Sequence, residues 1–213
     1  MKVKVLAAAF ALLTAATVFA DSKQYTVTSD GKNYASFESQ ATIETIKGVT
    51  MKVSGTVTAD PAHPENATTE VTIDLNSLDT GIEMRNGDLR SPKFVDTAKY
   101  PTATFKSVSV TSPVKSIDTN KPVELKVTGD FTLHGVTKRM TLPVRVVLIP
   151  ESDGTKTSRG AGDWIHASSK FPINLQDFNL PVPQKLMMKL ADTIDIILDV
   201  FAVARPATPP AAK

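Results

Sequence analysis

Residues 125–133 read LKVTGDFTL, and apolar and polar side chains alternate through almost the whole stretch. The odd positions carry the apolar residues Leu125, Val127, Phe131 and Leu133. Because successive side chains of a β-strand point to opposite sides, these four residues share one face of an extended chain. The even positions between them carry lysine, threonine and aspartate. The stretch therefore predicts a strand with one buried face and one face in water, which is typical of antiparallel sheets.

The same alternation recurs along the chain in stretches separated by Gly, Pro, Asn and Asp, residues that favour turns. The stretches are 25–28, 34–46, 49–54, 71–75, 142–149 and 194–200. After Gly48, the pattern predicts that Val49, Met51 and Val53 share one face. About eight consecutive strands of this kind predict an all-β fold, either an antiparallel up-and-down barrel or a sandwich.

Few segments have the character of helices or tight turns. Residues 78–89 and 92–98 predict short helical segments, and His134-Gly135 predicts the turn that follows the clearest strand. Residues 150–162 are longer and more polar than a minimal hairpin loop, so the sequence leaves their conformation open.

The chain begins with MKVKVLAAAFALLTAATVFA, in which Lys2 and Lys4 precede an uncharged apolar run. The run ends in a small-x-small pattern that a signal peptidase accepts. The uncharged stretch 5–20 has 16 residues, whereas a helix that spans a membrane needs roughly 20. Residues 1–20 therefore predict a cleaved signal peptide, with Asp21 as the first residue of a soluble chain that is exported to the periplasm or secreted.

The remaining sequence indicates the domain boundaries and the overall charge. Residues 205–213 carry three prolines and no apolar periodicity. They predict a disordered Pro/Ala-rich segment, which leaves residues 21–204 as one domain. Without the signal peptide, 22 basic and 22 acidic residues remain. This balance argues against nucleic-acid binding, which depends on an excess of Lys and Arg.

The residue types that carry most enzyme chemistry are scarce. The sequence has no cysteine, which excludes disulfides, thiolate nucleophiles and cysteine-bound metals. It contains neither a Gly-x-Ser-x-Gly nor a phosphate-binding-loop motif. Of the three histidines, His63 lies in a proline-rich loop, His134 in the predicted turn, and His166 follows the single tryptophan by two residues. We predict that His134 bonds to backbone, and we expect neither a metal site nor a catalytic centre.

Residues 71–105 carry a longer pattern, VTIDLNSLDTGIEMRNGDLRSPKFVDTAKYPTATF. It contains S-x-x-T at 77–80, E-x-R at 83–85, L-R-S at 89–91, F-x-D at 94–96 and A-x-Y-P-x-A-T-F at 98–105. Residues 129–138, GDFTLHGVTK, and 177–180, DFNL, follow in order. This set resembles the YceI-like family of lipid-binding proteins, and the resemblance extends over about residues 25–203. Asp88 departs from the family, in which many members carry histidine at that place.

The resemblance implies an extended, lipocalin-like, eight-stranded antiparallel β-barrel with one or two short helices. It also implies an apolar tunnel that holds a long isoprenoid or a similar amphiphile, such as a polyprenyl phosphate, an isoprenoid quinone or a fatty amide. An eight-stranded barrel has the width at which one slender ligand fits inside. The expected partner is thus an amphiphilic lipid, with transient membrane contact, no further cofactor, and a monomer or homodimer as the protein.

Eight residues are candidates for the wall or rim of this tunnel: Arg85, Arg90, Phe94, Phe105, Phe131, Trp164, Phe171 and Phe178. Four of them fall at predicted inward positions of strands: Phe105, Phe131, Trp164 and Phe171. A cavity wall and a packed core require the same residue types, so the sequence does not separate these two roles.

Arg85 and Arg90 have two interpretations. A planar guanidinium group suits an anionic head group, so the pair is a candidate clamp for a lipid phosphate. Alternatively, the two arginines pair with Glu83, Asp88 or Asp96 and hold the predicted helix across the end of the barrel. Asp88 brings negative charge to the same rim, which makes an uncharged head group such as a quinone equally suitable.

The leading hypothesis is a non-enzymatic, exported protein that sequesters or carries a long-chain isoprenoid or similar amphiphile between membranes. A second hypothesis is an enzyme that acts on a lipid or a peroxide, which requires an acid–base cluster around residues such as His134, His166 or Asp177. A third is a stress-related interaction module whose barrel is filled by side chains and has no continuous cavity.

Overall fold

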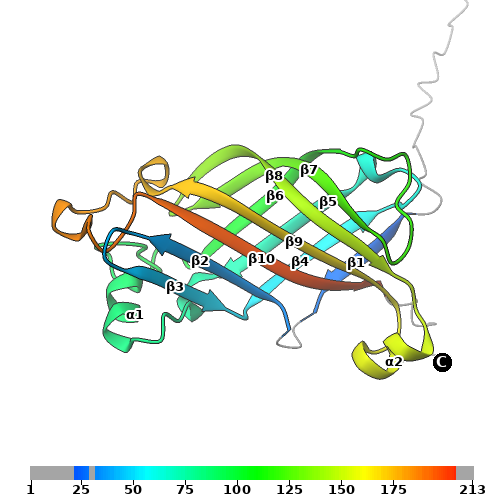
Figure 1. Ribbon diagram of the computed structural model, residues 1–213, viewed down its shortest axis with the longest axis horizontal. Coiled ribbons are helices and arrows are strands. Elements are labelled where there is room, and N and C mark those ends of the chain that lie inside the picture. The colour runs from blue at the N-terminus through cyan, green and yellow to red at the C-terminus, as the bar shows by residue number, and fades with distance from the viewer. Residues whose placement is uncertain (1–21, 29–31, 205–213) are drawn as a thin grey trace, which may run out of the picture.

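The computed structural model describes residues 22–28 and 32–204, which form a long barrel of antiparallel strands (Figure 1). The strands are β1 (Lys23–Val27), β2 (Tyr34–Gln40), β3 (Thr45–Thr50), β4 (Val53–Ala59), β5 (Thr68–Asp74), β6 (Thr102–Thr111), β7 (Pro122–Leu133), β8 (Val136–Ile149), β9 (Asp163–Asn174) and β10 (Thr193–Ala204). The described part also contains the helices α1 (Glu83–Arg90) and α2 (Asp153–Arg159). Neither of these helices is long and apolar enough to cross a membrane. The predicted signal peptide and C-terminal segment lie outside the described residues.

The ten segments form a barrel of eight strands because two of the strands are each interrupted once. β1 and β2 pair in succession with the same edge of β10, so that Thr26 lies opposite Val203 and Tyr34 lies opposite Asp199. β4 and β3 pair with β1 and β2 in the same way. From β4 to β10, neighbours in the wall are consecutive in sequence and antiparallel. The prediction of an eight-stranded antiparallel barrel is confirmed.

Side chains replace backbone pairing at both interruptions. Between β1 and β2, the buried Asn33 accepts a hydrogen bond from the N–H of Phe201 at 2.7 Å and donates one to the carbonyl of Thr28. Between β3 and β4, the N–H of Lys52 donates to the hydroxyl of Thr50 at 2.9 Å. These bonds satisfy polar groups that the interrupted ladder leaves without partners.

The second interruption corrects one prediction about side-chain direction. Thr50 and Val53 are buried, whereas Val49 and Met51 are exposed. The prediction that Val49, Met51 and Val53 share a face is therefore wrong. The chain turns at residues 51–52, and this corner shifts the alternation by one residue.

The inward faces of the strands form two buried apolar clusters. One cluster is rich in valine and includes Val27, Val71, Val110, Val127, Val146 and Val200. The other is rich in larger side chains and includes Phe131, Leu133, Leu142, Phe171, Leu175 and Phe178. Leu125, Val127, Phe131 and Leu133 are all buried, so the inward face predicted for β7 is confirmed.

Loops and turns cover the left-hand end of the barrel in Figure 1, which we call the closed end. It comprises residues 75–101 with α1, the turn at 134–135 and residues 175–192. His134 and Gly135 have positive φ angles of 51° and 74°, as a two-residue hairpin turn requires. Nδ1 of His134 lies 3.1 Å from the carbonyl oxygen of Phe178 and so joins two parts of this end. The predicted turn and the predicted backbone bond of His134 are both confirmed.

The two helices agree only in part with those predicted. α1 begins at Glu83 and overlaps the predicted segment 78–89. Residues 92–98 form turns, so the second predicted helical segment is wrong. The second helix is α2, within the region 150–162 whose conformation the sequence left open.

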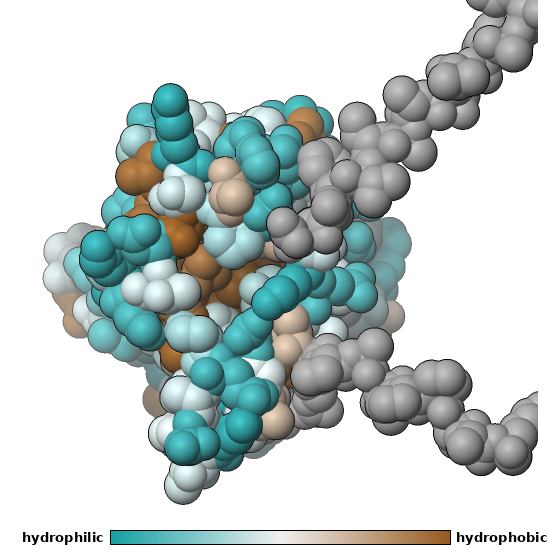
Figure 2. All heavy atoms as spheres, turned by 90° about the vertical axis from the view of Figure 1, so that its right-hand side faces the viewer, coloured by the Kyte–Doolittle hydropathy of each residue, from teal (hydrophilic) through white to brown (hydrophobic). Residues whose placement is uncertain are grey.

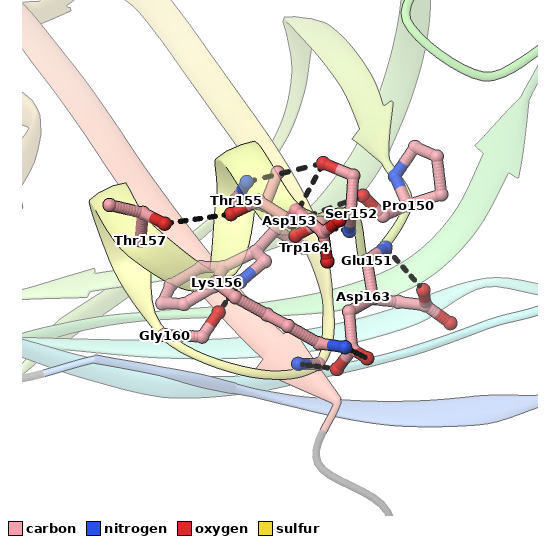
Figure 3. Close-up of polar contacts among 11 residues, drawn as sticks. Pro150, Glu151, Ser152, Asp153, Thr155, Lys156, Thr157, Gly160, Asp163 and Trp164 are labelled. Atoms are coloured by element: carbon pink, nitrogen blue, oxygen red, sulfur yellow. Dashed lines mark hydrogen bonds and ion pairs between the residues drawn. The ribbon is translucent and has the colours of Figure 1, made fainter.

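α2 connects β8 to β9 and is fixed by its own polar groups (Figure 3). The hydroxyl of Ser152 accepts a bond from the N–H of Thr155 at 3.2 Å, and the hydroxyl of Thr155 accepts one from the N–H of Ser152 at 2.7 Å. This reciprocal capping box starts the helix. Gly160 ends it with a positive φ angle of 97°, and the indole N–H of Trp164 donates to the Gly160 carbonyl at 3.2 Å.

The register of β7 leads to a stability prediction. Phe131→Asp places a charge in the apolar interior and should lower the free energy of unfolding by about 3–5 kcal/mol. Thr132→Asp changes a residue on the outer face, so its effect should stay within about 0.5 kcal/mol. Chemical denaturation of the two variants measures both values, and equal losses would contradict the register.

Candidate functional site

An internal cavity extends from the middle of the barrel to the right-hand end in Figure 1, which we call the mouth. The whole empty volume between its walls, including the part that opens to solvent, is about 1210 Å³. The wall consists of alternate strand residues, for example Leu125 and Val127 of β7 and Ile165 and Ala167 of β9. The wall is therefore almost entirely hydrocarbon.

Phe105, Phe131 and Phe171 close the inner end of the cavity, and Phe178 packs behind Phe131. The ring of Phe131 meets that of Phe171 with 5.8 Å between centroids and that of Phe178 with 5.5 Å, both edge to face. Phe105 lies opposite Phe131 on the neighbouring strand, and Gly129 leaves room for its ring, because a Cβ at residue 129 would meet that ring at 2.5 Å. Edge-to-face contact is a favourable arrangement of aromatic rings. The phenylalanines thus separate the cavity from the packed closed end.

Two loops form the rim of the mouth, residues 60–67 between β4 and β5 and residues 112–121 between β6 and β7. The N–H of Ile117 donates to the carbonyl of Pro61 at 2.8 Å, which joins the two loops. The N–H of Asn120 donates to the carbonyl of Leu148 at 2.7 Å and anchors the second loop to the barrel wall. Figure 2 views this end and shows apolar surface in a recess surrounded by hydrophilic residues.

Asp60 is the only charged residue in the described part of the chain that lines the cavity. Its side chain is buried at the mouth, where Oδ1 accepts the N–H of Ala62 and Oδ2 lies beside Nδ1 of His63, both at 2.9 Å. The hydrogen bonds from His63 and Ala62 hold the pKa of Asp60 below its ordinary value, and the bond to Asp60 raises the pKa of His63. The carboxyl is therefore ionised near neutral pH.

The candidate phenylalanines occupy three different places. Phe105, Phe131 and Phe171 line the cavity. Phe178 is buried behind Phe131, in the closed end. Phe94 lies among the turns after α1 and packs against the same apolar cluster, outside the cavity wall.

Trp164 corrects a prediction, because its side chain does not point into the barrel. Its neighbour Ile165 lines the cavity, and alternation along β9 places Trp164 on the outer wall. The indole is nevertheless buried, since α2 covers it: Figure 3 shows the bond to Gly160, and the guanidinium of Arg159 lies 5.9 Å from the ring centroid. Trp164 therefore attaches α2 to the barrel wall.

Arg85 and Arg90 lie at the closed end and do not line the cavity. Arg85 donates to the carboxylate of Glu44 at 2.8 Å and to the carbonyl of Thr80 at 3.0 Å. Arg90 donates to the carbonyl of Asn86 at 3.1 Å, within α1. These contacts are of the kind that holds the helix in place. The ion pair of Arg90 with Glu83, at 4.0 Å, is one of those expected, whereas Arg85 pairs instead with Glu44 of the turn between β2 and β3.

His166 lies on the outer wall, like Trp164. Its Nε2 is 2.9 Å from Oδ1 of Asp199, and its ring stacks on that of Phe201 with 4.2 Å between centroids. This pair is thus separated from the cavity by the barrel wall. Within the described residues, no group of three or more His, Asp or Glu side chains is arranged to hold a metal ion.

Sequence reasoning did not single out Asp60. In the sequence it is a lone acid among prolines, three residues before His63 of the same loop. A usable signal exists in hindsight, because Asp followed by two residues and a His in a proline-rich loop is typical of a side chain that bonds to its own backbone.

Comparison with known proteins places this barrel in a family. A family model described as the YceI-like domain matches residues 21–202. Protein YceI of Escherichia coli O157:H7 is 34% identical over 205 residues, which cover 95% of this chain and 98% of that protein. Protein YceI of Salmonella agona is 35% identical over 182 residues, which cover 84% of this chain and 88% of that protein.

Solved structures share the fold. BcnA of Burkholderia cenocepacia has a TM-score of 0.66 at 24% identity, covering 83% of this chain and 99% of that chain. A polyisoprenoid-binding domain from Saccharophagus degradans, implicated in plant cell wall breakdown, has a TM-score of 0.65 at 19% identity, covering 86% of this chain and 99% of that chain. The match of the family model over nearly all described residues, together with the identity to the curated relatives, shows that this chain belongs to the YceI-like family.

Proposed function

We propose that this protein is an exported, non-enzymatic binding protein that holds the hydrocarbon tail of a long-chain isoprenoid or similar amphiphile. The observation that carries the proposal is the apolar cavity, which is open at the mouth and closed at its inner end by three phenylalanines. Burial of a hydrocarbon tail contributes about 0.8 kcal/mol per methylene group. A long tail therefore gains enough free energy from this cavity without a demanding polar site.

The relatives support the same class of ligand. The structurally similar domain from Saccharophagus degradans is described as polyisoprenoid-binding, and its fold is shared over 86% of this chain. At 19% identity, this likeness supports the class of ligand and does not extend to a particular lipid.

The polar groups at the cavity fit a binding protein better than an enzyme. Asp60 and His63 bond to each other, and in the described part of the chain no hydroxyl group bonds to His63. The second pair of this kind, His166 and Asp199, lies on the outer wall. The filled-barrel hypothesis predicts no continuous cavity, so the observed cavity favours the binding protein over it.

Export is part of the proposal and rests on residues 1–20, whose basic start and apolar run are those of a signal peptide. A periplasmic or secreted protein meets amphiphilic lipids that leave a membrane. In such a compartment, an apolar cavity shields the ligand tail from water during transfer.

Contact with a membrane has support at the closed end. Residues 185–189 read KLMMK, and Leu186, Met187 and Met188 are all exposed between two lysines. Neither lysine forms an ion pair with another described residue, so both are available to anionic lipid head groups. We call residues 185–189 the membrane tip. Because this tip lies opposite the mouth, we expect it to tether the barrel with the mouth turned away from the bilayer.

The cavity is tested by the ligand that copurifies with the protein. Organic extraction of the exported protein, followed by mass spectrometry, should recover a lipid with a long hydrocarbon chain, and the intact protein should begin at Asp21. Val144→Trp fills the cavity and should reduce the recovered lipid severalfold, whereas Arg145→Trp, on the outer face of the same strand, should not. The proposal fails if repeated preparations contain no lipid and take up no polyprenyl or quinone probe.

The double variant Arg85→Gln/Arg90→Gln separates the two roles of these arginines. Because both residues hold α1 at the closed end, the change should lower the free energy of unfolding by about 1–2 kcal/mol. Affinities for a polyprenyl phosphate and for an uncharged analogue with the same tail should both remain unchanged. A selective loss of the phosphate ligand would instead support the head-group clamp.

The membrane tip is tested by cosedimentation with vesicles of phosphatidylcholine and phosphatidylglycerol. Met187→Glu should lower the bound fraction at least about fivefold, because it removes apolar contact and adds charge of the wrong sign. Val108→Glu changes another exposed apolar residue, away from the tip, and should bind like the unaltered protein. Equal binding of all three proteins would contradict the tether.

A further inference from the structure

The mouth carries a single charged group in an otherwise apolar wall. Asp60 is 7% exposed and lines the cavity where the cavity meets the loop 60–67. No lysine or arginine among the described residues lines the cavity. A ligand whose tail lies in the cavity must therefore place its polar end near this carboxylate or beyond it.

A second hollow adjoins the mouth on its outer side. Its empty volume, including the part that opens to solvent, is about 1020 Å³, and it lies between the two rim loops. Its polar lining includes His63, Glu65, Ser112 and Lys115, and it shares Val110 with the cavity. The cavity and the outer hollow thus share one lining valine, and the outer hollow offers the polar side chains that a wet head group requires.

The charge of Asp60 decides which head groups suit this place. A carboxylate accepts hydrogen bonds and repels other anions, and this repulsion is strong where the carboxylate is shielded from water. Of the cationic groups in the outer hollow, Lys115 is exposed and shares the lining with the acidic Glu65, and His63 already bonds to Asp60. A phosphate or a carboxylate head therefore gains little at the mouth, whereas a hydroxyl, an amide N–H or an ammonium group gains a charged acceptor.

We propose that the mouth is a head-group site for amphiphiles whose heads donate hydrogen bonds, and that Asp60 determines this specificity. The inference rests on the proposed function and narrows it. It favours long-chain alcohols, primary amines and primary amides over polyprenyl phosphates and fatty acids. It also disfavours a quinone head, which only accepts hydrogen bonds, relative to its reduced quinol, which donates them.

The test uses three ligands with one C20 isoprenoid tail: geranylgeraniol, geranylgeranylamine and geranylgeranyl phosphate. Each competes with the apolar fluorophore N-phenyl-1-naphthylamine for the cavity of the unaltered full-length protein at pH 7.5. The inhibition constants of the alcohol and of the amine should be at least about tenfold lower than that of the phosphate. A phosphate that binds as tightly as the alcohol overturns the proposal, whatever the variants do.

Asp60→Asn keeps the shape of the side chain and the acceptor for the Ala62 N–H but removes the charge. It should raise the affinity for the phosphate about tenfold and lower the affinity for the amine about tenfold. The affinity for the alcohol should stay within about threefold of that of the unaltered protein. Asp118→Asn is the matched control, because it removes an exposed acid from the other rim loop and lines neither the cavity nor the outer hollow, and it should preserve the order of the ligands. Thermal unfolding establishes that both variants are folded.

The outcomes separate this inference from the proposed function. If none of the three ligands displaces the fluorophore and the fluorophore itself does not bind, the proposed function fails. If all three bind with equal affinity, and Asp60→Asn changes none of them relative to the others, the cavity binds tails and the head-group site is wrong. A phosphate preference that disappears in His63→Gln would also overturn the role of Asp60, since the imidazolium would then be the group that selects.

Discussion

The size of the inward-pointing side chains decides where this barrel is filled and where it is hollow. An eight-stranded barrel is just wide enough for side chains to fill its interior or for one slender ligand to lie there. Toward the closed end, Phe131, Phe171 and Phe178 meet edge to face and leave no room. Toward the mouth, the same strands present mainly valine, alanine and isoleucine, whose side chains do not reach across the barrel. The cavity therefore requires no special backbone, only a change of residue size along the barrel axis.

The polar groups follow the same division between the two ends. At the closed end, His134 and Arg85 bond to backbone and to Glu44, and so they fix loops rather than contact the cavity. At the mouth, the only acid in the described part of the cavity wall is Asp60, which also shapes its loop through the N–H of Ala62. The polar groups named at the closed end thus hold loops in place, whereas the cavity opens at the other end. Arg85 and Arg90, which the sequence offered as a head-group clamp, belong to the closed end and do not line the cavity.

Much of the fold was predictable, because strict alternation of apolar and polar residues, as in β7, indicates a strand with one buried face and one exposed face. Predictions of side-chain direction were wrong where a local feature interrupts this alternation or resembles it. The corner at residues 51–52 reverses the faces of β3 relative to β4, and a sequence gives no sign of a corner without Gly or Pro. Trp164 is apolar and buried, yet it faces outward, because the end of α2 covers the indole with the Arg159 guanidinium and the Gly160 carbonyl, a cover that alternation does not reveal. The cavity phenylalanines on strands were placed well, whereas Asp60 was missed since a lone loop acid normally indicates a solvated surface.

The central claim is that a hydrocarbon tail enters from the mouth and ends at the phenylalanines in the middle of the barrel. A crystal structure of the protein with a long-chain alcohol that carries bromine on its last carbon tests this claim most directly. The anomalous signal of bromine should lie inside the barrel, beside the rings of Phe131 and Phe171, with the hydroxyl group near Asp60. A bromine signal at the mouth, in the closed end or on the outer wall beneath α2 would contradict the account.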